Sequence, residues 1–199
     1  ANPILLSFNI EDNLAPKLEF FAREIGLSCA ELRDWVVKNP TLLGYSLANR
    51  YRPRLEACRA AGVDAKRVLS YASRADEYFC ERIGMTIEDF EAVRESVAAD
   101  GALERCVVVV AAASSRVRPP FAAPRRRRTS AADAAQNLAD VRDLLRTRLS
   151  MTDAELDRVE RFQPAGARAT VEPKLGWLQK RLELDAAQLR KMVLTLPAL

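Results

Sequence analysis

The stretch Pro16–Pro40, PKLEFFAREIGLSCAELRDWVVKNP, returns at the far end of the chain as Pro173–Pro197, PKLGWLQKRLELDAAQLRKMVLTLP. The two copies align without a gap at an offset of 157 residues, and the apolar positions of one copy match apolar positions of the other. Self-similarity of this kind indicates a repeat architecture, in which a helical unit buries its apolar face by stacking on its neighbours. Function is then expected on the surface of the stack.

Further partial copies support the repeat. Thr152–Pro164 matches Ser28–Pro40 at an offset of 124, and the motif Asn2–Leu6 returns as Asn39–Leu43 after a step of 37 residues. Steps in the thirties are typical of repeats built from a pair of helices.

Helix start and stop signals agree with this unit. A proline stands where each first helix is expected to begin, because its missing N–H would lack an intrahelical partner there anyway. Glycine then ends the helix in the left-handed conformation, and an N-cap residue opens the second helix. We predict an all-α fold without strands over residues 14–97 and 138–199. The starting prolines are Pro16, Pro53 and Pro173, the N-caps are Ser28, Asp64, Thr86, Thr152 and Asp185, and the expected boundaries are Gly26, Pro40, Gly62, Gly84, Pro164 and Glu183.

The order of these motifs resembles the mitochondrial transcription termination factor (mTERF) family. The resemblance rests on Pro-Lys/Arg-Leu helices, the Asn-Pro-x-Leu-Leu motif, Gly44–Arg50 (GYSLANR) and Pro53–Leu55 (PRL), and it is best over residues 2–63. It implies an α-solenoid with two α-helices and a short 3₁₀ helix per unit. It also implies nucleic-acid binding in a mitochondrion or chloroplast and no enzymatic activity. We expect the chain to be part of a longer precursor whose targeting leader is not present here.

Composition divides the chain into three parts. We predict mTERF-like repeats at 1–110, a basic low-complexity linker or degenerate unit at 111–137, and further mTERF-like repeats at 138–199. The formal net charge is +4, but residues 111–137 hold six arginines and one acid, so the remaining residues sum to −1. Nucleic-acid binding by the repeats therefore requires their charge to be segregated onto one face.

The sequence gives little support for a catalytic site or a metal site. The chain has no histidine, which excludes imidazole catalysis and histidine-ligated metal. Its four cysteines form no C-x-x-C pair, so reduced thiols on helix faces are expected. We predict no cofactor, no metal site and no catalytic residue. The longest apolar run, Cys106–Ala113, has eight residues, far below a membrane span, so no membrane partner is expected.

Three sets of basic residues are candidates for nucleic-acid contact. Arg50, Arg52 and Arg54 surround Pro53 at a unit junction, with Tyr45 and Tyr51 beside them, a pattern that suits phosphate contact with stacking. Lys17 and Lys174 hold the position equivalent to Arg54, so the three could form a line of charges along the stack. The alternative is that such residues only cover apolar surface with their stems. The third set, Arg125, Arg126, Arg127 and Arg128, is either a solvated run or an arm that grips phosphates.

Two function classes remain. The first is a nucleic-acid-binding regulator of organellar transcription or its termination, with duplex DNA favoured and RNA possible as the partner. The second is a helical-repeat scaffold that binds a protein or RNA partner in organellar gene expression or ribosome assembly, which the near-neutral repeats favour.

Overall fold

The computed structural model describes residues 6, 8–99, 131–161 and 168–194. Every regular element in these ranges is helical and none is a strand, as the sequence predicts. The chain forms two compact units, one of residues 1–44 with 129–199 and one of residues 45–128.

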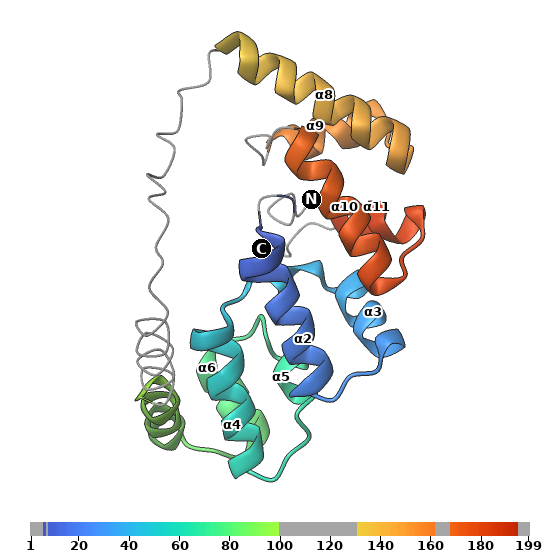
Figure 1. The fold of residues 1–199 in the computed structure, drawn as a ribbon. Helices are drawn as coiled ribbons and strands as arrows, with labels where there is room; N and C mark the ends of the chain where they lie inside the picture. The colour runs from blue at the N-terminus through green and yellow to red at the C-terminus, as the bar shows by residue number, and fades with distance from the viewer. Residues whose placement is uncertain (1–5, 7, 100–130, 162–167, 195–199) are drawn as a thin grey trace, which may run out of the picture. The chain divides into compact units, whose positions relative to one another are not determined.

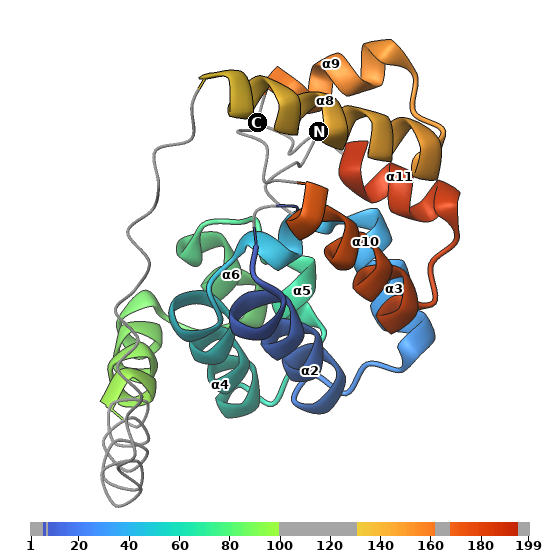
Figure 2. The same ribbon diagram turned by 45° about the horizontal axis from the view of Figure 1, so that its top comes forward.

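The first unit joins the two ends of the chain. Its N-terminal part contains η1 (Ile10–Leu14), α2 (Ala15–Arg23), α3 (Cys29–Lys38) and η2 (Pro40–Gly44). Its C-terminal part contains α8 (Ala131–Leu149), α9 (Asp153–Arg161), α10 (Arg168–Leu182) and α11 (Ala186–Leu194). Helix α3 packs against α2 and also against α10 and α11, and α11 packs against α8 and α9 (Figures 1 and 2).

The second unit follows the chain order. It contains η3 (Leu47–Tyr51), α4 (Arg52–Ala60), the short α5 (Arg67–Ser70), α6 (Asp76–Ile83) and a further helix at residues 87–99. Helix α4 packs against η3 and α5. The spacing from Gly62 to Gly84 is only 22 residues, too short for a full unit, and α5 accordingly has only four residues.

The buried core confirms the repeat. Residues that align at the offset of 157 are buried in both copies, which shows that the two apolar stripes serve the same purpose. The pairs are Leu18 and Leu175, Phe21 and Leu178, Ile25 and Leu182, Leu27 and Leu184, Leu32 and Leu189, and Val36 and Val193. Trp35 and Trp177, which we expected in the core, are half-buried.

The structure confirms several of the predicted caps and stops, but Asp64 is not an N-cap. Helix α5 begins at Arg67 after Lys66, and the Asp64 carboxylate accepts from the backbone N–H of Lys66 instead. Pro164 lies outside the described residues. Ser28 and Glu31 form a complete capping box, in which each side chain accepts from the backbone N–H of the other residue. Gly26, Gly62 and Gly84 have φ of +78°, +66° and +73°, the left-handed conformation that glycine adopts at low cost.

One prediction about helix starts is wrong. Pro173 lies inside α10, which begins five residues earlier at Arg168. Pro16 and Pro53 stand at the starts of α2 and α4, as predicted. A π-helical turn, η1 or η3, precedes each of these two helices, with a hydrogen bond from residue i to i−5 (Leu14 to Asn9, Tyr51 to Ser46). A wider turn before proline accommodates its missing N–H, so each of these helices has one extra turn before its proline.

The linker prediction is tested only at its end. Residues 131–137 belong to α8, where we expected linker. This helix start is reasonable because the sequence there is rich in alanine, the best helix former. The prediction that residues 114–132 are unstructured and protease-sensitive falls mainly outside the described residues, as does the assignment of residues 100–130 in general.

Candidate nucleic-acid interface

Arg54 is an interior residue of the second unit. Its side chain is 1% exposed, although it stands at the start of α4 in a charged sequence. The guanidinium donates to the backbone carbonyl oxygens of Tyr71 (2.6 Å) and Arg74 (2.7 Å) and to Oδ1 of Asp76 (2.6 Å from Nη2, 3.2 Å from Nε). The same group lies 4.6 Å from the centre of the Phe79 ring. Arg54 therefore ties the loop between α5 and α6 to α4.

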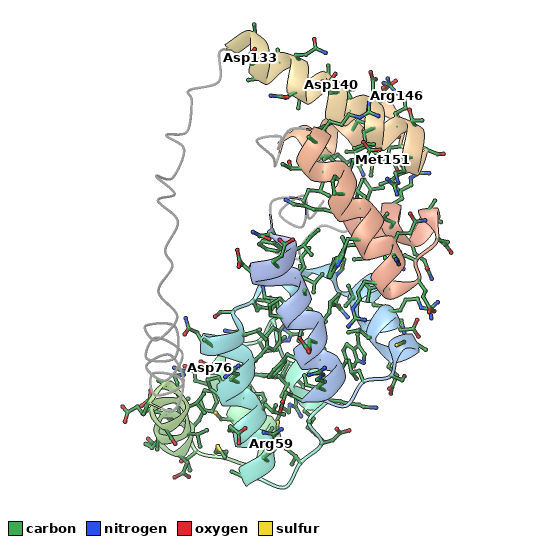
Figure 3. All side chains as sticks on the ribbon, in the orientation of Figure 1. Arg59, Asp76, Asp133, Asp140, Arg146 and Met151 are labelled. Atoms are coloured by element: carbon green, nitrogen blue, oxygen red, sulfur yellow. The ribbon has the colours of Figure 1, made fainter. Side chains whose placement is uncertain are left out.

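Asp76 completes this network at the first residue of α6, where it is labelled in Figure 3. It forms ion pairs with Arg54 and with Arg94, which lies on the helix at residues 87–99. Burial alone would raise the pKa of the Asp76 carboxyl, but the hydrogen bonds and charges of the two arginines outweigh it and hold the pKa below its ordinary value. The carboxylate is thus fixed as the counter-ion of Arg54.

Arg50 supports the same loop from a half-buried position. Its Nε donates to the carbonyl oxygen of Ala72 at 2.8 Å, and Nη2 donates to the carbonyl oxygen of Arg74. Its guanidinium also lies 5.3 Å from the centre of the Tyr45 ring. Two arginines from one junction therefore satisfy carbonyl groups of a loop that lies outside the regular helices.

Lys17 makes the equivalent contact in the first unit. Its side chain is 4% exposed, and Nζ donates to the carbonyl oxygen of Leu43 (2.5 Å) and to Oδ1 of Asn13 (2.6 Å). Burial lowers the pKa of this ammonium because the charged form loses hydration.

Lys174, the copy of Lys17 in α10, donates from Nζ to the carbonyl oxygen of Leu6 at 2.7 Å. Burial lowers its pKa as well, although part of the side chain remains exposed. The same repeat position therefore carries a basic side chain that binds a backbone carbonyl outside its own helix in each of three copies, at Lys17, Arg54 and Lys174.

This geometry corrects the expected line of exposed charges. Lys17 and Arg54 are too buried to touch a phosphate in this conformation, and their hydrogen bonds are made within the protein. Of the Arg50–Arg54 cluster, Arg52 is exposed. Tyr51, which we expected beside a stacked base, is 0% exposed, so its ring is part of the core.

The structure reveals a basic and aromatic cluster that the sequence did not lead us to expect. Arg74 and Arg82 are exposed, and their guanidinium groups lie 5.6 Å and 5.1 Å from the centre of the Tyr78 ring. The Tyr71 ring packs edge-on against Tyr78 with centroids 5.7 Å apart. The spacing of four residues from Tyr78 to Arg82 was the available signal, since residues so spaced share one face of α6, whereas Arg74 lies in the loop before this helix. We call these four residues the Tyr78 cluster.

Arg125, Arg126, Arg127 and Arg128 lie outside the described residues. Among the residues that are described, no group of cysteine, aspartate and glutamate is placed to hold a metal ion. No helix in these ranges has the length and apolar character needed to cross a membrane.

The fold and the repeated loop contacts define a helical-repeat protein. The mTERF family model matches residues 1–79, which include the α2–α3 pair and α4, α5 and part of α6. Over these residues the chain is similar to the mTERF family, a family of non-enzymatic, nucleic-acid-binding proteins. No solved structure matched the chain.

Proposed function

We propose that this protein binds duplex DNA and regulates organellar transcription, with the second unit as the binding surface. The contacts to phosphate come from Arg52, Arg74 and Arg82 and from the arginine run at residues 125–128. The mTERF match over residues 1–79 is the observation that carries the proposal, and the Tyr78 cluster with its two exposed arginines supports the choice of surface. Termination is the activity we propose within transcription.

The distribution of charge between the two units supports the same surface. Residues 45–128 contain 16 Lys and Arg against 11 Asp and Glu, whereas the other residues contain 15 against 16. The second unit therefore carries a formal +5 and the first a formal −1. A local excess of positive charge attracts the phosphate backbone and gives salt-dependent, sequence-independent affinity.

The positive net charge of the second unit depends on the arginines at residues 125–128. Residues 45–99 alone hold nine basic and nine acidic residues, and Glu77 and Glu81 are exposed on the same helix as Tyr78. Such a mixed surface attracts phosphate weakly by itself. We therefore propose that Arg125–Arg128 supply general affinity while the Tyr78 cluster fixes where the nucleic acid lies.

The balanced charge of the described helices also favours a second candidate, a scaffold for a protein partner. Both candidates place the protein in a mitochondrion or chloroplast.

Fluorescence anisotropy with a labelled duplex at several salt concentrations tests the proposal. The triple variant Arg52→Ala/Arg74→Ala/Arg82→Ala should flatten the plot of log K against log salt, by up to about 0.9 for each phosphate contact that the substitutions remove. The matched control is Arg23→Ala/Arg158→Ala/Arg168→Ala, which removes three exposed arginines from the first unit and should leave the slope unchanged. Circular dichroism checks that each variant remains helical.

Competition with double-stranded and single-stranded RNA separates DNA from RNA as the preferred partner. Equal slopes for the two triple variants would contradict the proposed surface. Failure of the wild-type chain to bind any of these nucleic acids at low salt would favour the scaffold.

A further inference from the structure

The stacking order of the first unit differs from the order of the sequence. The α10–α11 pair comes last in the chain, yet both of its helices pack against α3 of the first pair (Figures 1 and 2). Residues 39–167 separate the two pairs along the chain, so the contact between them depends on non-covalent interactions.

Two equivalent hydrogen bonds define the register of this contact. Lys17 and Lys174 are equivalent at the offset of 157, and Leu43 and Leu6 are equivalent at the step of 37. Lys17 donates to the carbonyl oxygen of Leu43 at 2.5 Å, and Lys174 donates to that of Leu6 at 2.7 Å. In both cases the lysine of a helix pair binds the end of an Asn-Pro-x-Leu-Leu motif.

The difference lies in where that motif stands in the chain. For the α2–α3 pair, the motif directly follows α3, as expected for one repeat. For the α10–α11 pair, the motif lies at the other end of the chain, just before η1. The hydrogen bond from Lys174 to Leu6 therefore has the geometry expected if the α10–α11 pair stood immediately before the Asn2–Leu6 motif in a continuous solenoid.

We propose that α3 and the Leu6 carbonyl form a docking surface for an mTERF-type helix pair, and that α10–α11 occupies it in place of the preceding repeat. The surface recognises a pair with a basic side chain at the Lys174 position and an apolar second helix. The C-terminal helices are therefore a separable module that extends the stack beyond the first repeat.

Packing across the contact is consistent with this assignment. Leu189, Met192 and Val193 of α11 are each 0% exposed, which is the burial expected of a helix inside a stack. At the edge of the contact, the Arg33 guanidinium on α3 lies 3.4 Å from the Glu183 carboxylate in the turn before α11. Because α11 packs against α3 as well as against α8 and α9, docking buries apolar surface between the module and α3 without a covalent link.

The test separates the module from the rest of the folded chain. A recognition site for a specific protease is inserted between residues 118 and 124 of the full chain, and the purified protein is cut after folding. Gel filtration and native mass spectrometry should show the two pieces eluting together as a complex of one copy of each. Dissociation is then measured by dilution.

Lys174→Met keeps the aliphatic stem and removes the ammonium, so the two pieces should dissociate about tenfold more readily or more, since hydrogen bonds of charged groups have roughly this effect. Lys180→Met on the exposed side of α10 is the matched control and should leave the affinity unchanged. Circular dichroism of the uncut Lys174→Met chain confirms that it folds.

Three results would overturn the proposal. The first is separation of the wild-type pieces at micromolar concentration, and the second is equal weakening of the complex by the two lysine variants. The third is a complex that contains two copies of each piece, which would show that the module docks on a second chain.

Discussion

Replacement of Arg54 by methionine distinguishes a structural arginine from a phosphate-binding one. The substitution preserves much of the side-chain length but removes four hydrogen bonds, to two backbone carbonyl groups and to Asp76. Breaking a buried ion pair by removing one partner costs about 3–5 kcal/mol. Asp76 keeps Arg94 as a partner and is 26% exposed, so we expect the lower end of this range, about 3 kcal/mol.

Thermal unfolding followed by circular dichroism measures this loss. A domain of the size of the second unit loses roughly 4–8 °C in midpoint for each kcal/mol, so its transition should fall by at least about 10 °C. Arg54→Lys should lose less, because an ammonium retains charge and one or two of the hydrogen bonds but cannot reproduce the planar fork. Below the shifted transition, Arg54→Met should bind duplex DNA with the wild-type salt slope. A stability loss under about 1 kcal/mol, together with a flatter slope, would refute the structural role of Arg54.

Three further predictions follow from the described residues. At pH 8 a maleimide should modify the exposed Cys29 in the folded chain but not Cys58, because burial raises the pKa of the Cys58 thiol to about 11. Peptide mass spectrometry identifies the modified cysteines, and equal labelling of the two would contradict the burial of Cys58. The pKa of Asp76 is lowered in the folded state, so its stabilising contribution is present at neutral pH and lost as the pH falls below the ordinary carboxyl range; urea unfolding should show a steeper acid loss for the wild type than for Asp76→Asn. Gly84→Ala should destabilise the protein by about 1 kcal/mol and Ser150→Gly should stabilise it by a similar amount, because both positions have positive φ. No atom lies within 4 Å of a Cβ at Gly84, so the effect there comes from the backbone alone. Denaturant unfolding midpoints that shift in the same direction for the two variants would contradict this backbone effect.

The sequence predicted the elements whose signals are local. The capping box of Ser28 and the left-handed Gly26 follow from residues within a few positions of each other, and the structure has both. The buried stripes were equally predictable, because the aligned copies show which positions must stay apolar in every unit. Each of these features depends on helix geometry alone.

The features that could not be predicted depend on distant partners. Arg54 resembled a surface charge because its acceptors, in the loop after α5, belong to a shortened unit that matches the repeat poorly. The docking of α10 and α11 on α3 was not predicted, because the sequence pattern does not record which distant units meet. The packing of these helices and the hydrogen bond from Lys174 to Leu6 show it. Burial of a cation is decided by which carbonyl groups converge on it, and no local pattern records that.

Photo-crosslinking to a duplex tests most directly whether the second unit contacts nucleic acid. The full chain is bound to DNA that carries a photoreactive base analogue, irradiated and digested, and the adducts are located by mass spectrometry. A competing excess of unmodified duplex serves as the control for specific contact. The proposed interface predicts adducts on the peptides that contain Tyr71 to Arg82 and the arginines at 125–128. Adducts confined to α8–α11, or absent from the Tyr78 cluster while the chain is bound, would contradict it.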